Sequence, residues 1–548
     1  MSKTYFLPLG GTGEIGMNLN LYGYQSNSVE EWIMVDCGVT FSQSGFPGID
    51  LQMADPNYIV KKKKYLKGVI LTHAHEDHIG AMPFIWPFLD CPIYTTKFTA
   101  SLLEEKFIER KIPYKNKLNI IETEDNFQLG SFDIKPLGLS HSIPEMNALV
   151  IKTPDSSIFH SGDWKIDSDP VVGGIFDKEK KEQLNNLDID LLVCDSTNAI
   201  VPGSSGSESQ VRDSLSEIIK DLSGRIFLTT FASNVARLTL VAQVAALHDR
   251  QVVLSGRGMH RIVNAAKSSG YFQDIPNFVD EEEAGYLPAD KSLILCTGSQ
   301  GEFRAALSKI ARDEHRYLYA EEGDTVIFSS KMIPGNEHGI LRLQNLFAKR
   351  GVNIITEKDS FVHVSGHPCK NELLEMFRLI SPKFMIPVHG EFRHMMANAE
   401  LASSCNIESK VIENGDLVSL RKNRIEIDSQ VENGRLHMDG NILVHDYESP
   451  ASERNKLSYN GLIMVSLSFR SQNKLKGRPH IKTIGIPKHN EMGIKFEDIL
   501  ENNILRNLKN KGEVKNLESK LRNSITKEIK HLWGKKPFVE IFLHYNEN

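Results

Sequence analysis

One short stretch of the sequence concentrates residues that bind metal ions. In LTHAHEDHIG, residues 71–80, three histidines and two acids fall within six consecutive positions, and the pattern HxHxDH is formed by His73, His75, Asp77 and His78. In an extended run the side chains at i and i+2 share one face, so His73 and His75 can hold one metal ion. A turn after them would direct Asp77 and His78 toward a second ion. We therefore predict a two-metal site rather than a set of surface or capping histidines.

Two metal ions need more than four ligands, and three further residues follow strand-like runs. They are His141 in LGLSHSIP, Asp163 in FHSGDWKID and His389 in FMIPVHGE. Taken singly, each is equally well explained as a packed or hydrogen-bonded side chain beside a strand. Taken together they support the prediction, because catalytic metal sites collect their ligands from several strand ends.

Short strands and helices must position these residues. The apolar run LKGVILT before His73 predicts a buried strand that ends at the cluster. A Gly/Ser-rich stretch at 201–215 leads into a capped helix, and strand and helix units then alternate through RIFLTTF, NVARLTLVAQVAALH, RQVVLSG and KSLILCTGS. Near residue 360 a second histidine cluster resembles the first in its chemistry, so we predict one α/β domain inserted into another. The end of the chain is predicted to be helix-rich, with a final strand FVEIFLHY.

The glycines of LPLGGTGEIGMN match a dinucleotide-binding motif in spacing but not in context. Gly11, Gly13 and Gly16 form GxGxxG, with Asp36 twenty residues after the last glycine. The residues after Gly16, MNLNLYGY, alternate with period two and turn through NSVEE into EWIMVDCG. This pattern predicts a β-hairpin, whereas a nucleotide site needs a helix. We expect tight-turn glycines near the floor of the metal site.

The composition is typical of a soluble globular protein of two or three domains. Of its 548 residues, 40% are hydrophobic and 24% charged; no apolar run could cross a membrane and no signal-peptide pattern opens the chain, so we expect a cytoplasmic protein without membrane partners. Six scattered cysteines without a CxxC pair argue against a disulfide framework. The net charge of −6 is uneven, because residues 451–548 hold 19 Lys and Arg against 10 Asp and Glu. This basic segment is either a solvated surface or a surface for nucleic acid or a partner.

The motifs in combination resemble the metallo-β-lactamase superfamily. HxHxDH, a later histidine and SGD, with Asp36 in MVDCG ahead of them, carry this resemblance. CDSTNA with Asp195, CTGSQGE, MIPGNE, HVSGH and VHGE resemble, in this order, the β-CASP nucleases and, among them, the ribonuclease J family. The likeness covers about residues 5–430 and continues more weakly to the end of the chain.

The resemblance implies a fold and a domain order. The expected fold is α/β, a metallo-β-lactamase αββα sandwich with an inserted α/β β-CASP domain and a small α+β C-terminal domain. The expected boundaries are 1–205 and 361–435 for the two parts of the metallo-β-lactamase domain, 206–360 for the β-CASP domain, 436–455 for a linker and 456–548 for the basic C-terminal domain. The family implies a homodimer or homotetramer, with this last domain as the oligomerisation element.

The resemblance also assigns roles residue by residue. Seven residues would bind two Zn²⁺ ions: His73, His75 and His141 one ion, Asp77, His78 and His389 the other, and Asp163 both. Asp36 would hold a ligand imidazole in its metal-binding tautomer. Asp195 matches the family's acidic motif and His367 its catalytic histidine, and with Asp77 they are the expected catalytic residues. The same ligands accept Mn²⁺, so the native metal stays open.

Two cations about 3.5–4 Å apart lower the pKa of a bridging water and stabilise an in-line displacement. We expect the resulting hydroxide to attack the phosphorus of an RNA linkage and His367 to protonate the departing ribose 3′-oxygen, which leaves a 5′-phosphate. The resemblance implies a ribonuclease of single-stranded RNA in rRNA processing and mRNA decay. It implies 5′-to-3′ exonuclease action that prefers a 5′-monophosphate, together with endonuclease cuts.

A preference for a terminal phosphate requires a pocket, and two Gly/Ser phrases are candidates. Backbone N–H groups of these phrases could bind the phosphate, with Arg257 as a cationic helper; the residues are Ala232, Ser233 and Asn234 of FASN and His363, Val364, Ser365, Gly366 and His367 of HVSGH. Plain turns explain the same phrases equally well. A structural Ca²⁺ site at Gly48, Asp50 and Asp446 is a further candidate, against a plain loop anchored by Pro47 and Pro56.

Three other functions remain open from the sequence. A small-molecule metallohydrolase would share HxHxDH, but it would not need the inserted domain or HVSGH. A β-CASP DNA nuclease is poorly distinguished, because recognition of the 2′-hydroxyl cannot be read from motifs. A non-catalytic binding protein would not need an intact ligand set.

Overall fold

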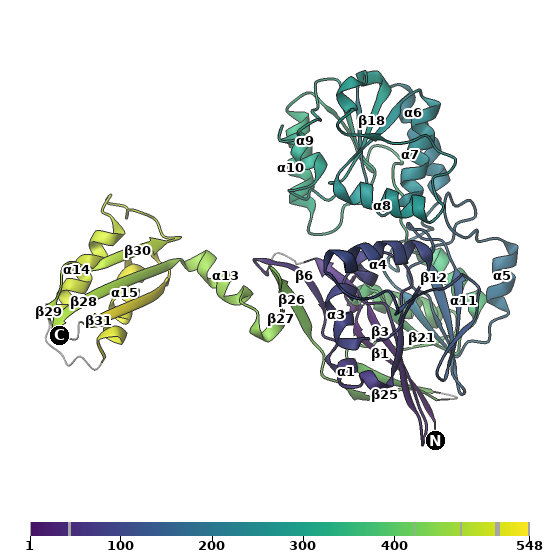
Figure 1. Ribbon diagram of the computed structural model, residues 1–548, viewed down its shortest axis with the longest axis horizontal. Helices are drawn as coiled ribbons and strands as arrows, with labels where there is room; N and C mark the ends of the chain where they lie inside the picture. Colours follow the sequence, from purple (N-terminus) through teal and green to yellow (C-terminus); the bar gives the residue numbers. More distant parts are fainter. Residues whose placement is uncertain (1, 42–44, 422–423, 472–473, 510–515, 546–548) are drawn as a thin grey trace. The chain divides into compact units, whose positions relative to one another are not determined.

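The computed structural model describes residues 2–41, 45–421, 424–471, 474–509 and 516–545. The chain divides into two compact units, one made of residues 1–41 and 51–436 and the other of residues 42–50 and 437–548 (Figure 1). Among the residues described, no helix combines the length and the apolar character needed to span a membrane. All six cysteines are free, as the absence of a CxxC pair predicted.

Two mixed sheets form the centre of the first unit. One has the order β25-β24-β1-β3-β4-β7-β8-β9, with the bounds Arg424–Gln430, Asp416–Arg421, Lys3–Gly10, Leu19–Gln25, Glu30–Val35, Leu66–Ile70, Ile93–Thr95 and Leu118–Ile120. The other has the order β10-β11-β12-β13-β14-β21-β23, with the bounds Phe127–Leu129, Phe132–Gly138, Asn147–Lys152, Ser157–His160, Leu191–Asp195, Phe384–Val388 and Glu408–Ser409. A shared apolar core between them contains Phe6 and Ile33 of the first sheet and Leu149 and Ile386 of the second.

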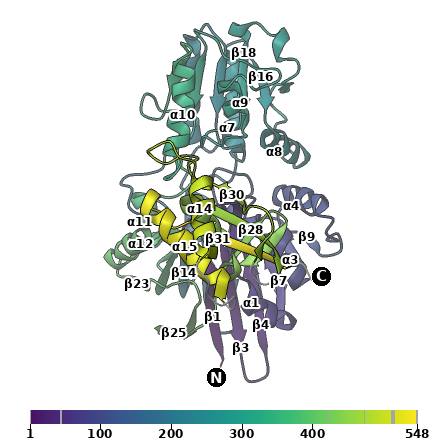
Figure 2. The ribbon, with the colours of Figure 1, turned by 90° about the vertical axis from the view of Figure 1, so that its left-hand side faces the viewer.

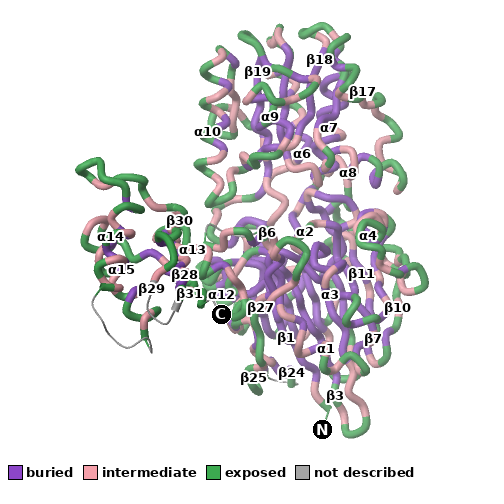
Figure 3. The backbone as a smooth tube through the Cα atoms, turned by 60° about the vertical axis from the view of Figure 1, so that its left-hand side comes forward, coloured by how far each residue is buried: buried purple, intermediate pink, exposed green. Residues whose placement is uncertain are grey.

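Helices cover the outer faces of both sheets. Three helices pack Leu184, Leu373 and Ala402 against Phe159 and Leu192 of the second sheet; they are α5 (Lys178–Asn185), α11 (Lys370–Ile380) and α12 (Phe392–Ser404). On the first sheet, Tyr58 of α1 (Asn57–Lys61) packs edge-on against Trp32 of β4, with ring centroids 5.6 Å apart. Figure 3 shows the buried residues concentrated along the strands of this unit. The predicted αββα sandwich is confirmed.

A whole domain interrupts the second sheet in sequence. β14 ends at Asp195, and its parallel neighbour β21 begins at Phe384, with Asp195 in register with Val388. The chain between them forms an all-parallel sheet of order β17-β16-β18-β15-β19-β20, with the bounds Val279–Asp280, Gln251–Ser255, Ser292–Cys296, Ile226–Thr229, Thr325–Phe328 and Asn353–Ile355. Its flanking helices are α6 (Glu208–Lys220), α7 (Val235–Leu247), α8 (Arg257–Ser268), α9 (Ala306–Ala311) and α10 (Glu337–Ala348) (Figure 1 and Figure 2). The insertion of an α/β domain is confirmed.

The first helix of the inserted domain begins where the sequence predicted a capped helix. Ser207 precedes α6, and its Oγ accepts a hydrogen bond from the backbone N–H of Ser209. The backbone N–H of Ser207 in turn donates to Oε1 of Gln210 at 3.0 Å. This reciprocal capping satisfies N–H groups that the first turn leaves without helical partners, so the Gly/Ser-rich stretch ends here.

The GxGxxG glycines lead into a hairpin rather than a helix. β3 follows them and pairs antiparallel with β4, from Asn20 opposite Val35 to Gln25 opposite Glu30. Gly16 has φ of +106°, which a glycine adopts without strain. The Gly11 carbonyl accepts a hydrogen bond from the backbone N–H of His389 at 2.6 Å. Gly11 and Gly16 therefore lie in bends beside the histidine cluster, as predicted, whereas Gly13 belongs to the short strand β2 (Thr12–Gly13), which pairs with β22 (Gly390–Glu391).

The second unit contains an α+β domain. β28 (Leu462–Ser471) pairs antiparallel with β29 (Lys474–Leu475) and β30 (His480–Ile484), and parallel with the predicted final strand, β31 (Phe538–Tyr545). Two helices complete its core through Leu500 and Ile525; they are α14 (Phe496–Lys509) and α15 (Leu517–Trp533). The segment 436–455, expected as a linker, contains β27 (Ile442–His445) and the start of α13 (Ala451–Asn460), because its short run Ile-Leu-Val forms a strand.

Candidate metal centre

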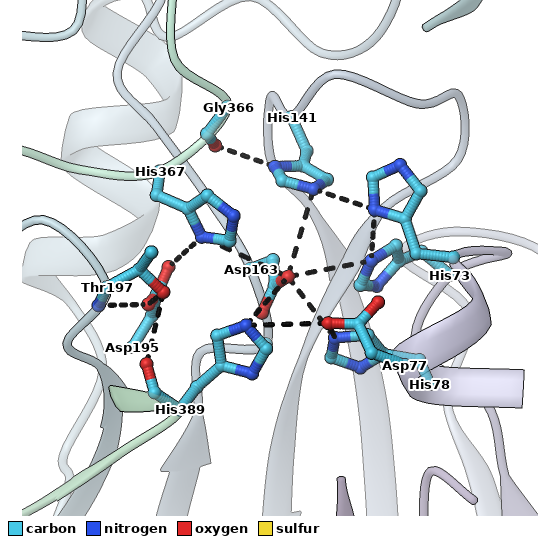
Figure 4. A network of polar contacts seen from close by, with 12 residues as sticks. His73, Asp77, His78, His141, Asp163, Asp195, Thr197, Gly366, His367 and His389 are labelled. Carbon is cyan, nitrogen blue, oxygen red and sulfur yellow. Dashed lines mark hydrogen bonds and ion pairs between the residues drawn. The ribbon is translucent and has the colours of Figure 1, made fainter. Parts of the chain in front are cut away.

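The HxHxDH cluster lies where β7 ends. β7 is buried and apolar, and the chain continues extended to His75, the N-cap of α2 (Glu76–Ile79), at φ −69° and ψ 150°. Nε2 of His73 lies 3.1 Å from Nδ1 of His75. The turn into α2 brings Asp77 Oδ2 within 3.6 Å of His78 Nε2 (Figure 4). The loop thus presents two separate pairs of donor atoms.

Three other strand ends bring His141, Asp163 and His389 to this loop. His141 follows β11, Asp163 follows β13 and His389 follows β21. β13, β14 and β21 are parallel neighbours, so their carboxyl ends meet at one edge of the sheet. His141 Nε2 lies 3.1 Å from His75 Nδ1, and Asp163 Oδ2 lies 3.6 Å from His389 Nε2. The structure brings together all seven residues that the sequence predicted as ligands.

The seven side chains form two groups that share Asp163. Within each group the potential ligand atoms lie within 4.8 Å of one another; the groups are His73, His75, His141 and Asp163, and Asp77, His78, Asp163 and His389. Oδ2 of Asp163 lies 3.8 Å from Nε2 of His73 and 3.2 Å from Nε2 of His78. One carboxylate between two sets of imidazoles is the arrangement that a two-metal site requires.

The donor atoms of these groups fit divalent cations. Nδ1 of His75 faces the ring nitrogens of both His73 and His141, although three imidazole nitrogens cannot satisfy one another. Nε2 of His389 is buried and has no hydrogen-bond partner among the described residues. A cavity of about 10 Å³, room for about one water-sized species, is lined by His78, Asp163 and His389. Imidazole and carboxylate donors suit zinc and also manganese.

Burial keeps most of the clustered imidazoles neutral. It lowers the pKa of His73 and His141 well below the usual range, and neighbouring histidines add to the effect. Burial also lowers the pKa of His75 to about 4. Burial acts on His78 in the same direction, but the carboxylates around it prevail and raise its pKa well above the usual range. Neutral imidazoles offer the lone pairs that metal binding requires.

Contacts behind the imidazoles determine which ring nitrogen faces the site. Asp36, expected to hold a ligand imidazole, has its Oδ2 2.7 Å from Nδ1 of His78. Its carboxylate also accepts hydrogen bonds from the backbone N–H and the hydroxyl of Thr72, at 2.8 and 2.9 Å. Nδ1 of His141 donates to the carbonyl of Gly366 at 2.6 Å. With Nδ1 used in this way, Nε2 of His78 and His141 is the nitrogen that faces the candidate site.

Two polar residues of this outer layer were missed by the sequence reasoning. Thr72 also lies 3.0 Å, through its Oγ1, from Nδ1 of His73. Asn18, beside the turn glycines, contacts both His78 and His389. Both residues are buried in strand-like apolar surroundings, and a polar residue in such a run is the signal that could have singled them out.

His367 and Asp195 form a pair beside the shared carboxylate. Nδ1 of His367 lies 2.8 Å from Oδ2 of Asp195 and 4.0 Å from Oδ2 of Asp163. The backbone N–H and the hydroxyl of Thr197 donate to the other Asp195 oxygen at 2.9 and 2.8 Å. Burial disfavours the charged imidazole, but Asp195 and Asp163 outweigh it and raise the pKa of His367 to about 9. His367 is therefore protonated at neutral pH and can donate a proton from Nε2.

The HVSGH phrase lies against the site. A side chain at Gly366 would come within 2.8 Å of the His141 ring, so only glycine fits there. Ser365 Oγ accepts from Nδ2 of Asn198 at 2.8 Å and from the His367 backbone N–H at 3.1 Å. Burial, with nearby cations, lowers the pKa of His363 to about 3, and its Nδ1 has no partner among the described residues. Val364 is buried and contributes packing.

The FASN phrase begins α7. Asn234 is the N-cap: its Oδ1 accepts from the backbone N–H of Arg237 at 2.9 Å, and its Nδ2 donates to Glu208 at 3.2 Å. Both polar atoms of the Asn234 side chain are therefore hydrogen-bonded within the β-CASP domain. Ala232 and Ser233 are half-buried. Arg257, the exposed first residue of α8, is close to this phrase, since a Cβ on the next residue, Gly258, would lie 3.6 Å from Cβ of Ala232.

The candidate calcium residues lie in the second unit. A Cβ at Gly48, which has φ of +79°, would meet Nη1 of Arg454 at 2.5 Å. Asp446 Oδ1 lies 3.3 Å from Nε2 of His437, and Asp50 is exposed. A calcium ion at Gly48, Asp50 and Asp446 stays a prediction.

Comparison with known proteins identifies the family. Four family models match: beta-lactamase superfamily domain at residues 31–199, ribonuclease J beta-CASP domain at 223–347, Zn-dependent metallo-hydrolase RNA specificity domain at 351–411 and ribonuclease J C-terminal domain at 451–546. The chain is 41% identical to ribonuclease J of Sinorhizobium meliloti over 98% of its own length and 96% of the relative's. It is 33% identical to ribonuclease J of Corynebacterium glutamicum, over 97% and 74% of the two lengths.

A solved structure shares the fold. A protein of unknown function from Enterococcus faecalis superimposes with a TM-score of 0.54 at 16% identity, over 77% of this chain and 100% of the other. Together with the four domain matches, the αββα sandwich, the inserted parallel sheet and the convergent histidines and aspartates lead to one conclusion: the chain belongs to the ribonuclease J family, the β-CASP nucleases of the metallo-β-lactamase superfamily.

Proposed function

We propose that this protein is a metal-dependent ribonuclease that hydrolyses single-stranded RNA and leaves a 5′-phosphate. The observation that carries the proposal is the carboxylate of Asp163, whose Oδ2 lies within 3.8 Å of Nε2 of His73 and His141 and within 3.6 Å of Nε2 of His78 and His389. The match at residues 351–411 to an RNA specificity domain supports RNA as the substrate.

The proposed ligands are the two groups already described, with Asp163 common to both. Bound divalent cations would supply a water of lowered pKa and neutralise charge on the phosphate during in-line displacement. His367 would then donate its proton to the departing 3′-oxygen from Nε2, because Nδ1 is held by Asp195. The hydrogen bonds from Thr197 orient the Asp195 carboxylate toward that imidazole.

We propose the HVSGH segment as the main binding site for a 5′-terminal phosphate. His363 faces the positive charges of Arg237, Lys331 and Lys165, which lower its pKa together with burial. Arg237 and Lys165 are paired with Glu208 and Asp167, so the exposed Lys331 and the spare imidazole nitrogen are the groups that could contact a phosphate. The backbone N–H groups of Ala232 and Ser233 in FASN and the exposed side chain of Arg257 remain candidates for binding the phosphate. The Asn234 side chain is not one, because it is hydrogen-bonded to Arg237 and Glu208.

Zinc is the proposed metal, with manganese as the alternative for the same donors. A homodimer or homotetramer assembled through the C-terminal domain, a cytoplasmic location, and a role in rRNA processing and mRNA decay are further proposals, and each follows from the family resemblance.

One digestion experiment tests the proposed activity. Single-stranded RNA labelled at its 5′ end, carrying either a monophosphate or a triphosphate, is incubated with the full chain with and without chelator. We expect metal-dependent release of mononucleotides from the monophosphate substrate, slower attack on the triphosphate, and internal cuts. A matched DNA strand separates the ribonuclease from the alternative β-CASP DNA nuclease, and equal cleavage of DNA would refute the proposed specificity. A chromogenic ester, for which we expect no turnover, tests a small-molecule metallohydrolase.

A further inference from the structure

Asn18 is hydrogen-bonded both to the HxHxDH loop and to His389, two parts of the candidate metal centre that lie far apart in sequence. It is buried, with 3% of its surface exposed, at the turn before β3. Its Oδ1 contacts His389, which follows β21. Its Nδ2 lies 3.0 Å from the carbonyl oxygen of Asp77 and 3.2 Å from Nε2 of His78, both in the α2 turn. No other described side chain is hydrogen-bonded to the imidazole of His389.

The orientation of the Asn18 amide follows from its surroundings. The backbone N–H and Nδ2 of Asn18 both lie 3.0 Å from the carbonyl oxygen of Asp77. A carbonyl can only accept, so the nitrogen of the amide must face Asp77 and the oxygen must face the other way. On that other side Oδ1 lies 3.0 Å from Nδ1 of His389.

This orientation determines the tautomer of His389. An amide oxygen only accepts, so Nδ1 of His389 carries the proton and donates it to Asn18. The lone pair is then on Nε2, the buried nitrogen without a hydrogen-bond partner, 3.6 Å from Oδ2 of both Asp77 and Asp163. Gly11 leaves room for this contact, because a Cβ at that position would lie 2.4 Å from Oδ1 of Asn18. Its carbonyl also accepts a hydrogen bond from the backbone N–H of His389.

We propose that Asn18 is a positioning residue of the second metal site, the one formed by Asp77, His78, Asp163 and His389. By accepting from Nδ1 of His389 it directs Nε2 to the ion. The carbonyl of Asp77 is also held by the backbone N–H of Asn18, a contact that a substitution at this position leaves in place. Among the described residues, no hydrogen bond joins Asn18 to His73, His75 or His141. Loss of Asn18 should therefore weaken one metal site and leave the other intact. The inference rests on the proposed two-metal centre.

Three variants isolate the contact. Asn18→Leu keeps the branched shape of the side chain and removes both the acceptor and the donor. Asn18→Asp removes the donor to Asp77 but keeps an acceptor for His389. Asn503→Leu is the matched control, because Asn503 of α14 is likewise a buried asparagine, 5% exposed, and its side chain is hydrogen-bonded to Glu528 and Ser524 rather than to a proposed ligand.

The measurement is Mn²⁺ binding to the metal-free full-length chain, by equilibrium dialysis and electron paramagnetic resonance, with thermal unfolding of each metal-free variant. We expect two ions and a spin-coupled spectrum for the wild type, Asn503→Leu and Asn18→Asp. For Asn18→Leu we expect one tight ion, a second ion weakened about 10–100-fold and an uncoupled spectrum.

The inference is overturned if Asn18→Leu binds both ions as tightly as the wild type, or loses both ions equally. It is also overturned if Asn18→Asp loses the second ion as Asn18→Leu does, which keeps the test decisive should the leucine variant fail to fold. A wild-type chain that binds fewer than two ions refutes the two-metal centre itself, a failure distinct from that of Asn18.

Discussion

Nδ1 of His367 lies 2.8 Å from Oδ2 of Asp195, although the two residues belong to different segments on either side of the β-CASP insertion. Asp195 ends β14, and His367 is in the segment that returns from the inserted domain to α11. The pair therefore forms only when both halves of the metallo-β-lactamase domain and the returning chain are in place. This makes it a sensitive point at which to test the proposed chemistry.

Replacement of Asp195 by asparagine should move the alkaline limb of the pH–rate profile. Asp195, with Asp163, raises the pKa of His367 to about 9 against the effect of burial. A proton donor works below its pKa, so activity falls as the pH rises through that value, and loss of the Asp195 charge lowers the pKa and moves the fall to lower pH. The check is kcat/KM for single-stranded RNA between pH 6 and pH 10, roughly the range that spans the donor's titration. An unchanged alkaline limb would show that another group titrates there.

His367→Ala should lower kcat by about 10²–10⁴-fold while the metal content stays at the wild-type level. His367 is not one of the seven proposed ligands, so we expect its removal to take away the proton donor and spare the metal centre. Metal analysis is needed beside the kinetics, because His367 forms a third group of potential ligand atoms with Asp163 and Asp195. Single-turnover digestion of RNA, together with metal analysis of the same preparation, measures both quantities. Turnover within a few-fold of the wild type, with metals still bound, would remove His367 from the proton-donor role.

Asp36→Asn should weaken metal binding about 10–100-fold. Asp36 has φ of +64°, a conformation that asparagine tolerates, so the backbone should keep its shape. The Thr72 backbone N–H needs an oxygen as acceptor, so the asparagine nitrogen would face His78. Nδ1 of His78 would then have to accept a hydrogen bond, and the ring proton would move to Nε2, the nitrogen that faces the proposed metal. Competition with a coloured chelator gives the dissociation constants. If affinity is unchanged, the 2.7 Å contact does not control the tautomer of His78.

Removal of the metal should abolish RNA cleavage and lower the melting temperature. An ion that binds only the folded chain stabilises it by about 2.7 kcal/mol at a free concentration of 100 times the dissociation constant. Calorimetric scans before chelation, after chelation and after Zn²⁺ or Mn²⁺ is restored measure the effect. Chelator already saturated with the same ion is the control and should change nothing. Full activity in excess chelator would contradict a metal-dependent reaction.

Arg237→Met should destabilise the β-CASP domain by about 3–5 kcal/mol. Arg237 Nε donates to buried Glu208 at 2.8 Å, and Nη1 donates to the carbonyls of Ser329 and Val362, both at 2.9 Å. Burial disfavours the Glu208 carboxylate, but Arg237 holds its pKa below the usual value. The pair therefore contributes fully to the free energy of unfolding above the ordinary glutamate pKa. This contribution is lost as the pH falls from that value through the lowered pKa of Glu208.

Denaturant unfolding of two further variants completes this test. Arg237→Met combined with Glu208→Gln should cost less than Arg237→Met alone, because no buried charge is left unpaired. Lys291→Met, which removes an exposed partner of Asp249, should leave the unfolding midpoint unchanged. Equal unfolding midpoints for Arg237→Met and Lys291→Met would show that the buried ion pair stabilises the fold no more than the exposed one.

The sequence by itself determined which histidines and aspartates are the proposed ligands, their positions at strand ends and the insertion of the second α/β domain. The HxHxDH loop needs only the local rule that an extended run presents i and i+2 on one face, and His73 Nε2 lies 3.1 Å from His75 Nδ1 accordingly. The alternation after Gly16 was likewise enough to predict the hairpin β3–β4 in place of a nucleotide-binding helix.

Only the tertiary structure decided which residues are hydrogen-bonded to the proposed ligands. Asn18 and His389 are 371 positions apart, and their contact depends on β1, β3 and β21 lying in two sheets that face each other. The same holds for the Gly366 carbonyl on His141 and for Asn234, whose side chain caps a helix instead of facing a phosphate. Hydrogen bonds between distant segments have no periodicity or spacing in the chain, because the packing of whole elements sets them, so no local pattern could have predicted them.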